Sequence, residues 1–458
     1  MSLFHPRSLR ASILALFSAL LLLLAVACSA PPTLVAPTPR IVAVVITATP
    51  SDTPTEQPTE TPRPTETPTA TPTLTPTSTP SPTLKSPPKP PSGGAVGSDV
   101  RFMGQLIAYF SKLGPYPPEP PIARPPNVDP LTGLVVDPVL LQRRPILARL
   151  GNDPQARPHA GLNQADLVFE EMIDQQHGFF SVTRLTAVFL GQDATVRPFR
   201  SARQVNASLQ PMLNGALAHS GAGKGVRFLF SNLPWGTPLT KSLNLDDLWF
   251  GSSYCLIGNY WVTRVASTTE HIHETLKAKG LDQAAPLRGF DFSSTAPGGA
   301  PASSVALDHQ PWPITTSSVQ WKYDPGSGRY LRFSLGAPHN TQQYPLNGNW
   351  GGDCTPGAVT STEQVSAANV VVLNAEYEPT DARDFTEDSL GSTSVFIELT
   401  GSGTARIYRD GVQIVGTWQR PTLQHFFRFV DAGGNVIPLK PGNTWFEITS
   451  LGYTPTVK

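Results

Sequence analysis

The chain has 458 residues, of which 34 are basic and 34 acidic, so its formal net charge is zero. Charged residues make up only 15% of the sequence. This balance lacks the basic excess with which proteins bind nucleic acid or an anionic membrane surface, so it predicts neither as a partner.

Residues 1–27 have the organisation of a secretory signal. Arg7 and Arg10 form a basic region, Ile13–Leu24 is almost entirely apolar, and Ala25-Val26-Ala27 follows. The apolar run is shorter than the roughly 20 residues that a membrane span needs. We therefore expect the leader to be removed.

The placing of Cys28 after Ala-Val-Ala resembles the bacterial lipobox, although Ala25 replaces the leucine that is usual there. The resemblance implies that Cys28 is acylated and that the mature protein is extracytoplasmic, lipid-anchored to the bacterial cell membrane, with the bilayer as its partner. The alternative is a secreted protein that is cut near Ala27 or Ala30.

Residues 28–99 are predicted to form a disordered tether. Between Pro31 and Pro91 there are 18 prolines, interleaved mainly with Thr and Ser. Such a segment buries too little apolar surface to offset the entropy of ordering it. We interpret it as a spacer between the lipid anchor and the folded part.

Three cysteines are present, and two of them follow the tether, Cys255 and Cys354. In an oxidising compartment they could form one disulfide, but the sequence does not establish that they meet. No CxxC motif or His/Cys cluster has the spacing of a zinc site, so neither a metal nor a cofactor is predicted.

The remaining chain, about 350 residues, is long enough for two domains. Residues 100–293 alternate short apolar runs with helix-like stretches such as 204–213, which predicts a mixed α/β domain. The apolar runs are Pro145–Leu150, Ala165–Met172, Thr183–Leu190 and Ala216–Ser220. Ser267-Thr268-Thr269-Glu270 predicts a capping box that opens a helix through Lys279, ended by Gly280.

An arginine cluster follows the apolar run 183–190. It consists of Arg197, Arg200 and Arg203, with Ser201 between them. Guanidinium groups present planar forks of donors, so the cluster could bind a carboxylate or a phosphate. The alternative is internal pairing with carboxylates, for which the candidates are Glu170, Glu171 and Asp174.

His219 and Ser220 follow another apolar run and precede a glycine-rich turn. Strand ends of α/β sheets are common ligand sites, which makes both residues candidates. The turn lacks the spacing of a phosphate-binding loop and of a nucleophile elbow. A strand-ending turn with a hydrogen-bonded histidine is the alternative.

Several segments of this part resemble the YerB-type family of bacterial lipoproteins, which pairs two domains whose function is not established. The segments are Asp129–Gly133, Arg144-Pro145, Ala156–Gly161, Asn163–Asp166, Thr183-Arg184, Arg197–Arg203 and His219–Gly221. The resemblance implies a polar group of ligand-binding residues, namely Glu170, Arg184, Arg197, Arg200, Ser201, Arg203 and His219. Members usually carry Pro-His-Asn where this chain has Arg264-Val265-Ala266, which argues against an enzyme.

Residues 303–458 are predicted to form a β-rich domain, because their apolar pattern has mostly a period of two. Asp410-Gly411 predicts a type I′ hairpin. Trp418, Phe426 and Trp445 could line a sugar-stacking face or pack in the core. The predicted fold is thus α+β, with a mixed α/β N-terminal domain followed by a β-rich C-terminal domain behind the disordered tether.

These observations leave three hypotheses about function. The first is a noncatalytic lipoprotein that binds an anionic envelope glycan, peptide or protein partner through the arginine cluster. The second is an envelope hydrolase that uses Glu170 or Asp174 with His219. The third is a structural scaffold with internally paired arginines. The oligomeric state stays open.

Overall fold

The computed structural model describes residues 119–175, 182–223, 226–227, 229–230, 243–247, 250–309, 318–379 and 393–458. All of them belong to one unit, Thr77–Lys458. The predicted signal (1–27), Cys28 and the tether (28–99) lie outside the described residues. None of the helices in the described part is long and apolar enough to cross a membrane.

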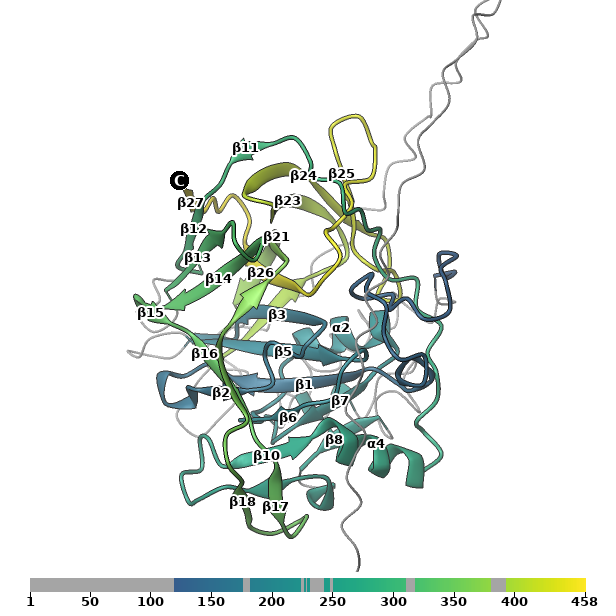
Figure 1. Cartoon of the computed structure of the whole chain (residues 1–458), viewed down its shortest axis with the longest axis vertical. Coiled ribbons are helices and arrows are strands. Elements are labelled where there is room, and N and C mark those ends of the chain that lie inside the picture. Colours follow the sequence, from purple (N-terminus) through teal and green to yellow (C-terminus); the bar gives the residue numbers. More distant parts are fainter. Residues whose placement is uncertain are drawn as a thin grey trace, which may run out of the picture. The chain divides into compact units, whose positions relative to one another are not determined.

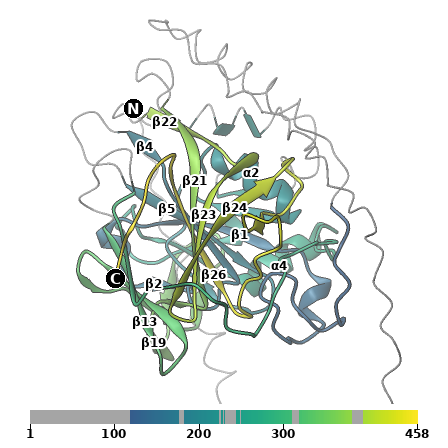
Figure 2. The ribbon, with the colours of Figure 1, turned by 90° about the horizontal axis from the view of Figure 1, so that it is seen from above.

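The largest sheet has 13 strands and takes them from both parts of the chain. Its main path runs β11-β24-β23-β21-β26-β3-β5-β1-β7-β8, and Figure 2 shows the long strands β21, β23 and β24 side by side. In path order the bounds are Ala300–Pro301, Val412–Arg420, Gly401–Arg409, Asn369–Pro379, Thr444–Ser450, Leu167–Met172, Thr183–Phe189, Ile146–Gly151, Ala216–His219 and Asn244–Asp246. Off this path lie β4 (Asp174–Gln175), β22 (Thr393–Glu398) and β25 (Arg428–Val430).

The two parts of the chain meet in this sheet where β3 pairs with β26 (Figure 1). The pairing is parallel, and its register places Val168 beside Trp445 and Glu170 beside Glu447. A cross-strand pair of like charges is unfavourable by itself. The seam between β3 and β26 therefore needs positive charge from elsewhere.

The described residues also form four smaller sheets. A six-stranded sheet contains β12 (Ser304–Leu307), β13 (Val319–Asp324), β14 (Arg329–Ser334), β15 (Ala337–Pro338), β20 (Ser366–Ala367) and β27 (Thr456–Val457). The others are β2 (His159–Ala160) with β16 (Asn340–Gln343) and β19 (Ser361–Gln364); β6 (Thr195–Val196) with β9 (Cys255–Leu256) and β10 (Val265–Thr268); and β17 (Leu346–Gly348) with β18 (Cys354–Pro356).

The prediction of a mixed α/β first domain is wrong, because the described residues are dominated by strands. The longer α-helices in the described residues are α2 (Val205–Leu213) and α4 (Thr269–Ala278). The order of apolar runs is as predicted, but β1, β5 and β3 pair antiparallel, without the crossover helices that parallel strands need. Short 3-10 helices lie at Leu140–Gln142, Pro154–Ala156 and Gly251–Ser253.

Both faces of the large sheet are covered by apolar side chains. Leu147, Phe169 and Phe446 belong to one core cluster, while their strand neighbours Val168 and Trp445 belong to the other. Because successive side chains on a strand point to opposite faces, a charged residue in these strands is buried on one face or the other. Trp418, Phe426 and Trp445 are all buried, so they pack in the core.

The predicted Asp410-Gly411 turn and the helix after residue 268 are confirmed, but the predicted capping box is not. Asp410 and Gly411 both have positive φ, 53° and 76°, and they connect the antiparallel strands β23 and β24, as a type I′ turn requires. Helix α4 begins one residue after Thr268, whose side chain accepts a hydrogen bond from the backbone N–H of His271 at 3.2 Å. The cap is therefore Thr268 rather than Ser267.

A disulfide joins Cys255 of β9 to Cys354 of β18, the pairing that the sequence left open. The Trp350 ring, in the turn between β17 and β18, stacks on His271 of α4 with 3.7 Å between ring centroids. The hairpin of β17 and β18 is thereby fixed against the segment 251–271.

Asp129 and Asp166 form a buried carboxyl pair at the start of β3. Their side chains hydrogen-bond each other, which requires one shared proton. Asp166 also accepts from the backbone N–H groups of Leu190 and Gly191 at 2.6 and 3.0 Å. Burial raises the pKa of both groups, and the Asp129 carboxylate raises that of Asp166 further.

We expect Asp166→Asn to stabilise the protein increasingly as pH rises. The raised pKa means that the folded state holds a proton that the unfolded state releases above the ordinary aspartate pKa of 3.8. The contribution of this pair to the free energy of unfolding is therefore largest below the ordinary pKa. It decreases as the pH rises to the pKa in the folded state. Urea denaturation midpoints between pH 5 and 8 would test this, and parallel profiles for the variant and the wild type would contradict it.

Candidate functional site

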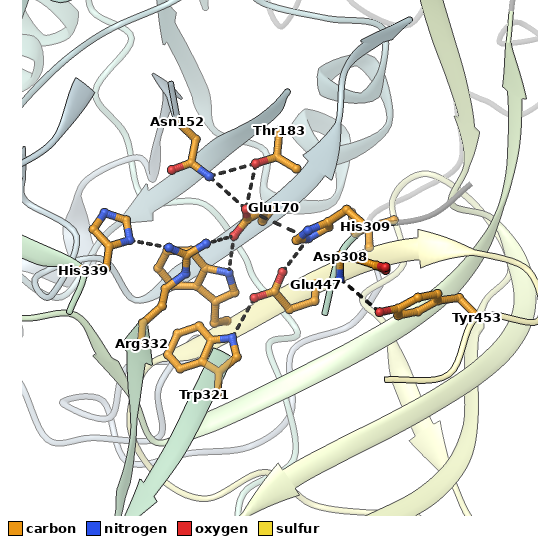
Figure 3. A network of polar contacts seen from close by, with 12 residues as sticks. Asn152, Glu170, Thr183, Asp308, His309, Trp321, Arg332, His339, Glu447 and Tyr453 are labelled. Carbon is orange, nitrogen blue, oxygen red and sulfur yellow. Dashed lines mark hydrogen bonds and ion pairs between the residues drawn. The ribbon is translucent and has the colours of Figure 1, made fainter. Parts of the chain in front are cut away.

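Glu170 lies at the centre of a buried polar cluster at the seam between β3 and β26. Its Oε2 accepts from Arg332 Nη2 at 2.7 Å and from Trp445 Nε1 at 3.2 Å. Its Oε1 accepts from Asn152 Nδ2 at 2.9 Å and from the Thr183 hydroxyl at 2.8 Å. Figure 3 shows Glu170 between Arg332 and His309.

Glu447 occupies the neighbouring position on β26. Its Oε1 accepts from Trp321 Nε1 and its Oε2 from His309 Nε2, both at 2.8 Å. His309 Nε2 also lies 4.0 Å from Glu170 Oε1. We call Glu170, His309, Arg332 and Glu447 the junction cluster, and all four side chains are at most 1% exposed.

Two further histidines extend the cluster. Arg332 Nη1 donates to His339 Nδ1, so His339 carries its proton on Nε2 and donates it to His159 Nδ1 at 2.9 Å. His159 Nε2 then donates to the carbonyl of Gly151 at 2.6 Å. The direction of this chain of hydrogen bonds is fixed, because a guanidinium only donates and a carbonyl only accepts.

The pKa values of these groups follow from burial and neighbouring charge. Burial lowers the pKa of His159 to about 3 and that of His339 well below its usual value, so both rings are neutral. Burial would raise the pKa of Glu170, but Arg332 and His309 outweigh it and lower the pKa. Burial and the Glu170 charge raise the pKa of Glu447. The Glu170 and Glu447 carboxylates overcome the effect of burial on His309 and raise its pKa.

Arg184, Ser201 and Arg203 belong to a second polar cluster on the opposite face of the sheet. Both arginines donate to the Ser201 carbonyl, at 2.7 and 3.5 Å. The neighbouring carboxylate is Glu171, which pairs with Arg149 at 2.5 Å and also interacts with Arg184. Burial raises the pKa of Glu171 to about 7 in spite of these cations.

Arg197 and Arg200 lie nearer the surface, beneath the segment 260–263. Arg197 Nε donates to the Thr263 carbonyl at 2.8 Å, and Arg200 Nη1 donates to the Val262 carbonyl at 3.0 Å and pairs with Asp153 at 3.4 Å. The Arg200 guanidinium lies 5.2 Å from the centroid of the Trp261 ring. We call Arg197, Arg200, Tyr260 and Trp261 the aromatic–arginine surface.

His219 is not brought to Glu170. It ends β7, where Nε2 contacts Asn244 Oδ1 at 2.6 Å and Nδ1 contacts the Gly221 carbonyl at 2.8 Å. Three strand spacings separate β7 from β3, about 14 Å, and His219 shares the sheet face of Leu217, opposite to that of Glu170. The backbone of Asp174 lies in β4, and its side chain is outside the described part.

Sequence reasoning missed most of the junction cluster. His309, Trp321, Arg332 and Glu447 come from segments far from Glu170 in the chain, and their spacing carries no signal. One available signal is a charged residue inside an apolar strand, as in Trp445-Phe-Glu447-Ile448. Such a charge needs a buried partner. Among the described residues, Glu170, His309 and Glu447 are the group whose ligand atoms could hold a metal ion.

We expect Glu170→Gln to destabilise the fold strongly, because it leaves Arg332 and His309 without their shared counter-charge. Removing one partner of a buried ion pair costs about 3–5 kcal/mol. Urea denaturation of the wild type and the variant would measure the change. Glu363→Gln is the control, since Glu363 is exposed and pairs with Asn163 at the surface. Equal losses in the two variants would contradict the assignment.

Comparison with known proteins agrees with this architecture. Residues 131–239 match the N-terminal domain, and residues 311–446 the C-terminal domain, of a protein family of unknown function, DUF3048. The Bacillus subtilis (strain 168) protein named "Putative lipoprotein YerB" is 24% identical over 324 residues, which are 70% of this chain and 85% of that protein.

The crystal structure of YerB from Bacillus subtilis has a similar fold, with a TM-score of 0.52 and 22% sequence identity. The match covers 70% of this chain and 95% of the crystallised one. The two family domains follow each other along the chain in the same way, one in each part. The chain therefore belongs to the YerB-type family, whose members pair the two DUF3048 domains.

Proposed function

We propose that this protein is an extracytoplasmic lipoprotein, anchored through acylated Cys28, that binds an anionic envelope glycan at the aromatic–arginine surface without catalysing a reaction. The leader, the cysteine that follows it and the name of the Bacillus subtilis relative support the location. The tether would let the folded part reach ligands away from the membrane.

The observation that carries the binding proposal is the exposure of two adjacent aromatic rings. Trp261 is 67% exposed and Tyr260 51% exposed, although large aromatic side chains usually lie in the core. Trp261 also lies over the Arg200 guanidinium, which holds the ring at a charged position. Exposed aromatic groups of this kind mark interaction surfaces.

The chemistry of this surface favours a sugar that carries an acidic group. Aromatic rings bury the apolar faces of ligands well. A guanidinium offers paired donors to a carboxylate or a phosphate. Arg200 contacts Asp153 at 3.4 Å, a partly exposed pair at the long end of the range, so an anionic ligand could compete for this cation.

The other two hypotheses fit the geometry less well. Hydrolysis by Glu170 with His219 needs both groups at one reacting bond, whereas they lie on opposite faces of the sheet. The scaffold hypothesis accounts for the buried Arg184 and Arg203. It gives no role to the exposed rings of Tyr260 and Trp261.

We expect Trp261→Ala and Arg200→Ala to weaken glycan binding by at least about 10-fold each, equivalent to about 1.4 kcal/mol. Calorimetric titration of the full chain with a carboxylate-bearing peptidoglycan fragment would measure the affinity. The neutral N-acetylglucosamine oligomer should bind more weakly and lose little affinity in Arg200→Ala.

Lys322→Ala is a matched control for these variants. It removes another surface cation that lies over an aromatic ring, 4.2 Å from the centroid of Phe333, and should leave the affinity unchanged. Failure of the folded wild type to bind any fragment would favour the scaffold hypothesis.

We expect Cys28→Ala to release the protein from the membrane into the medium, because the acyl chains that hold it there are attached to this cysteine. Fractionation of cells followed by detection of the protein would test this. Ser29→Ala is the control and should remain on the membrane. Retention of Cys28→Ala would show that Cys28 is not the anchor.

A further inference from the structure

We propose that Glu170, His309 and Glu447 bind a single divalent transition-metal ion. One oxygen of each carboxylate and one ring nitrogen of His309 all lie within 4.8 Å of one another, and all three residues are buried. The inference is independent of the proposed glycan binding, because it uses none of the residues of the aromatic–arginine surface.

The spacing of the ligand atoms suits one ion. His309 Nε2 lies 2.8 Å from Glu447 Oε2 and 4.0 Å from Glu170 Oε1. Zinc bonds to nitrogen and oxygen are about 2.0–2.2 Å long, so ligand atoms around one ion are separated by about 3–4 Å. Small side-chain adjustments would place all three atoms in the first coordination shell.

The carboxylates are held from behind by nitrogen donors. Trp321 binds Glu447 Oε1, while Trp445 and Arg332 bind Glu170 Oε2. Glu447 Oε2 and Glu170 Oε1 are the oxygens nearest to His309 Nε2, and Glu170 Oε1 also accepts from Asn152 Nδ2 and from the Thr183 hydroxyl. Orientation of ligands by outer hydrogen bonds is a common property of metal sites.

His309 carries two features that hydrogen bonding to Glu447 does not require. Its backbone φ is 50°, a left-handed conformation that is uncommon for residues other than glycine. Its Nδ1 is buried and has no hydrogen-bond partner among the residues that the structure describes. A metal at Nε2 would displace the proton that Nε2 shares with Glu447, and the ring would then keep its remaining proton on Nδ1.

The ligand set favours zinc, cobalt or manganese over calcium or magnesium. One imidazole nitrogen with two carboxylate oxygens suits borderline transition metals, whereas calcium and magnesium prefer oxygen ligands throughout. A metal ion bound at Nε2 would replace the ring proton that His309 directs at Glu447 and would take over its role as a cation between the two carboxylates. Three protein ligands leave a position for a water molecule or a ligand atom.

The test uses the full chain, unfolded with a chelator and refolded with Zn²⁺, Co²⁺ or Mn²⁺, so that burial does not prevent loading. After removal of free metal, elemental analysis should find one ion per folded wild-type chain. The cobalt form should show visible absorption bands of a protein-bound ion. Wild-type protein that retains none of the three metals would overturn the proposal and leave an ion-pair cluster.

Two variants assign the ion to these residues. His309→Asn suits the left-handed backbone, because asparagine tolerates that conformation, and Glu447→Gln keeps the shape of the side chain. Both should lose the retained ion, whereas Trp321→Phe should weaken metal binding about 10- to 100-fold.

His273→Asn is the control, because His273 forms another largely buried pair with a carboxylate, at 3.0 Å from Asp282. It should retain the ion as the wild type does. Retention of one ion by folded His309→Asn would place the metal elsewhere and overturn the assignment. Circular dichroism identifies the folded samples.

Discussion

The structure depends on how the paired negative charges of Glu170 and Glu447 are balanced where its two parts share a sheet. Parallel pairing of β3 with β26 places these carboxylates side by side in the interior. Arg332, from β14, and His309, from the segment after β12, supply the positive charge. The first part could not bury Glu170 at low cost without Arg332 of the second part. The repulsion between Glu170 and Glu447 thus favours only pairings of β3 with β26 in which Arg332 and His309 also reach them.

Beyond Arg332, a chain of hydrogen bonds runs in a fixed direction from donor to acceptor. His339 and His159 are neutral. Arg332 donates to His339, His339 donates to His159, and His159 donates to the Gly151 carbonyl. The link carries no further charge into the core, so the ionic part of the network ends at Arg332. A polar network whose members are satisfied in one arrangement favours a unique packing over alternatives.

Local structure was predictable from the sequence to a much greater extent than the site. Apolar runs, the Asp410-Gly411 turn and the helix that follows residue 268 depend on nearby residues, and the structure contains each of them, although its cap is Thr268 and not Ser267. The contact between β3 and β26 joins positions 275 residues apart, as in Trp445 with Glu170. No local pattern encodes a pairing of this kind, so the junction cluster was not foreseen.

The predicted arginine cluster separates for a related reason. Residues 197–203 follow a largely irregular path, so neighbouring side chains enter different environments, and Arg203 is buried while Arg200 reaches Trp261. Because the arginines are close in sequence, a single anion site was predicted. Closeness in sequence does not indicate in which direction each side chain points. The mixed α/β prediction failed similarly, because the short apolar runs were correct but their connections are mostly turns and short strands rather than helices.

The disulfide between Cys255 and Cys354 closes a covalent ring that contains His309, Arg332 and His339. At the extracytoplasmic location that we propose, the protein would meet proteases, and a single cut within this ring would not divide the molecule into two pieces. Both fragments would stay linked until a reductant opened the bridge. The residues that balance the seam are thus kept on one molecule even after the backbone between them is broken.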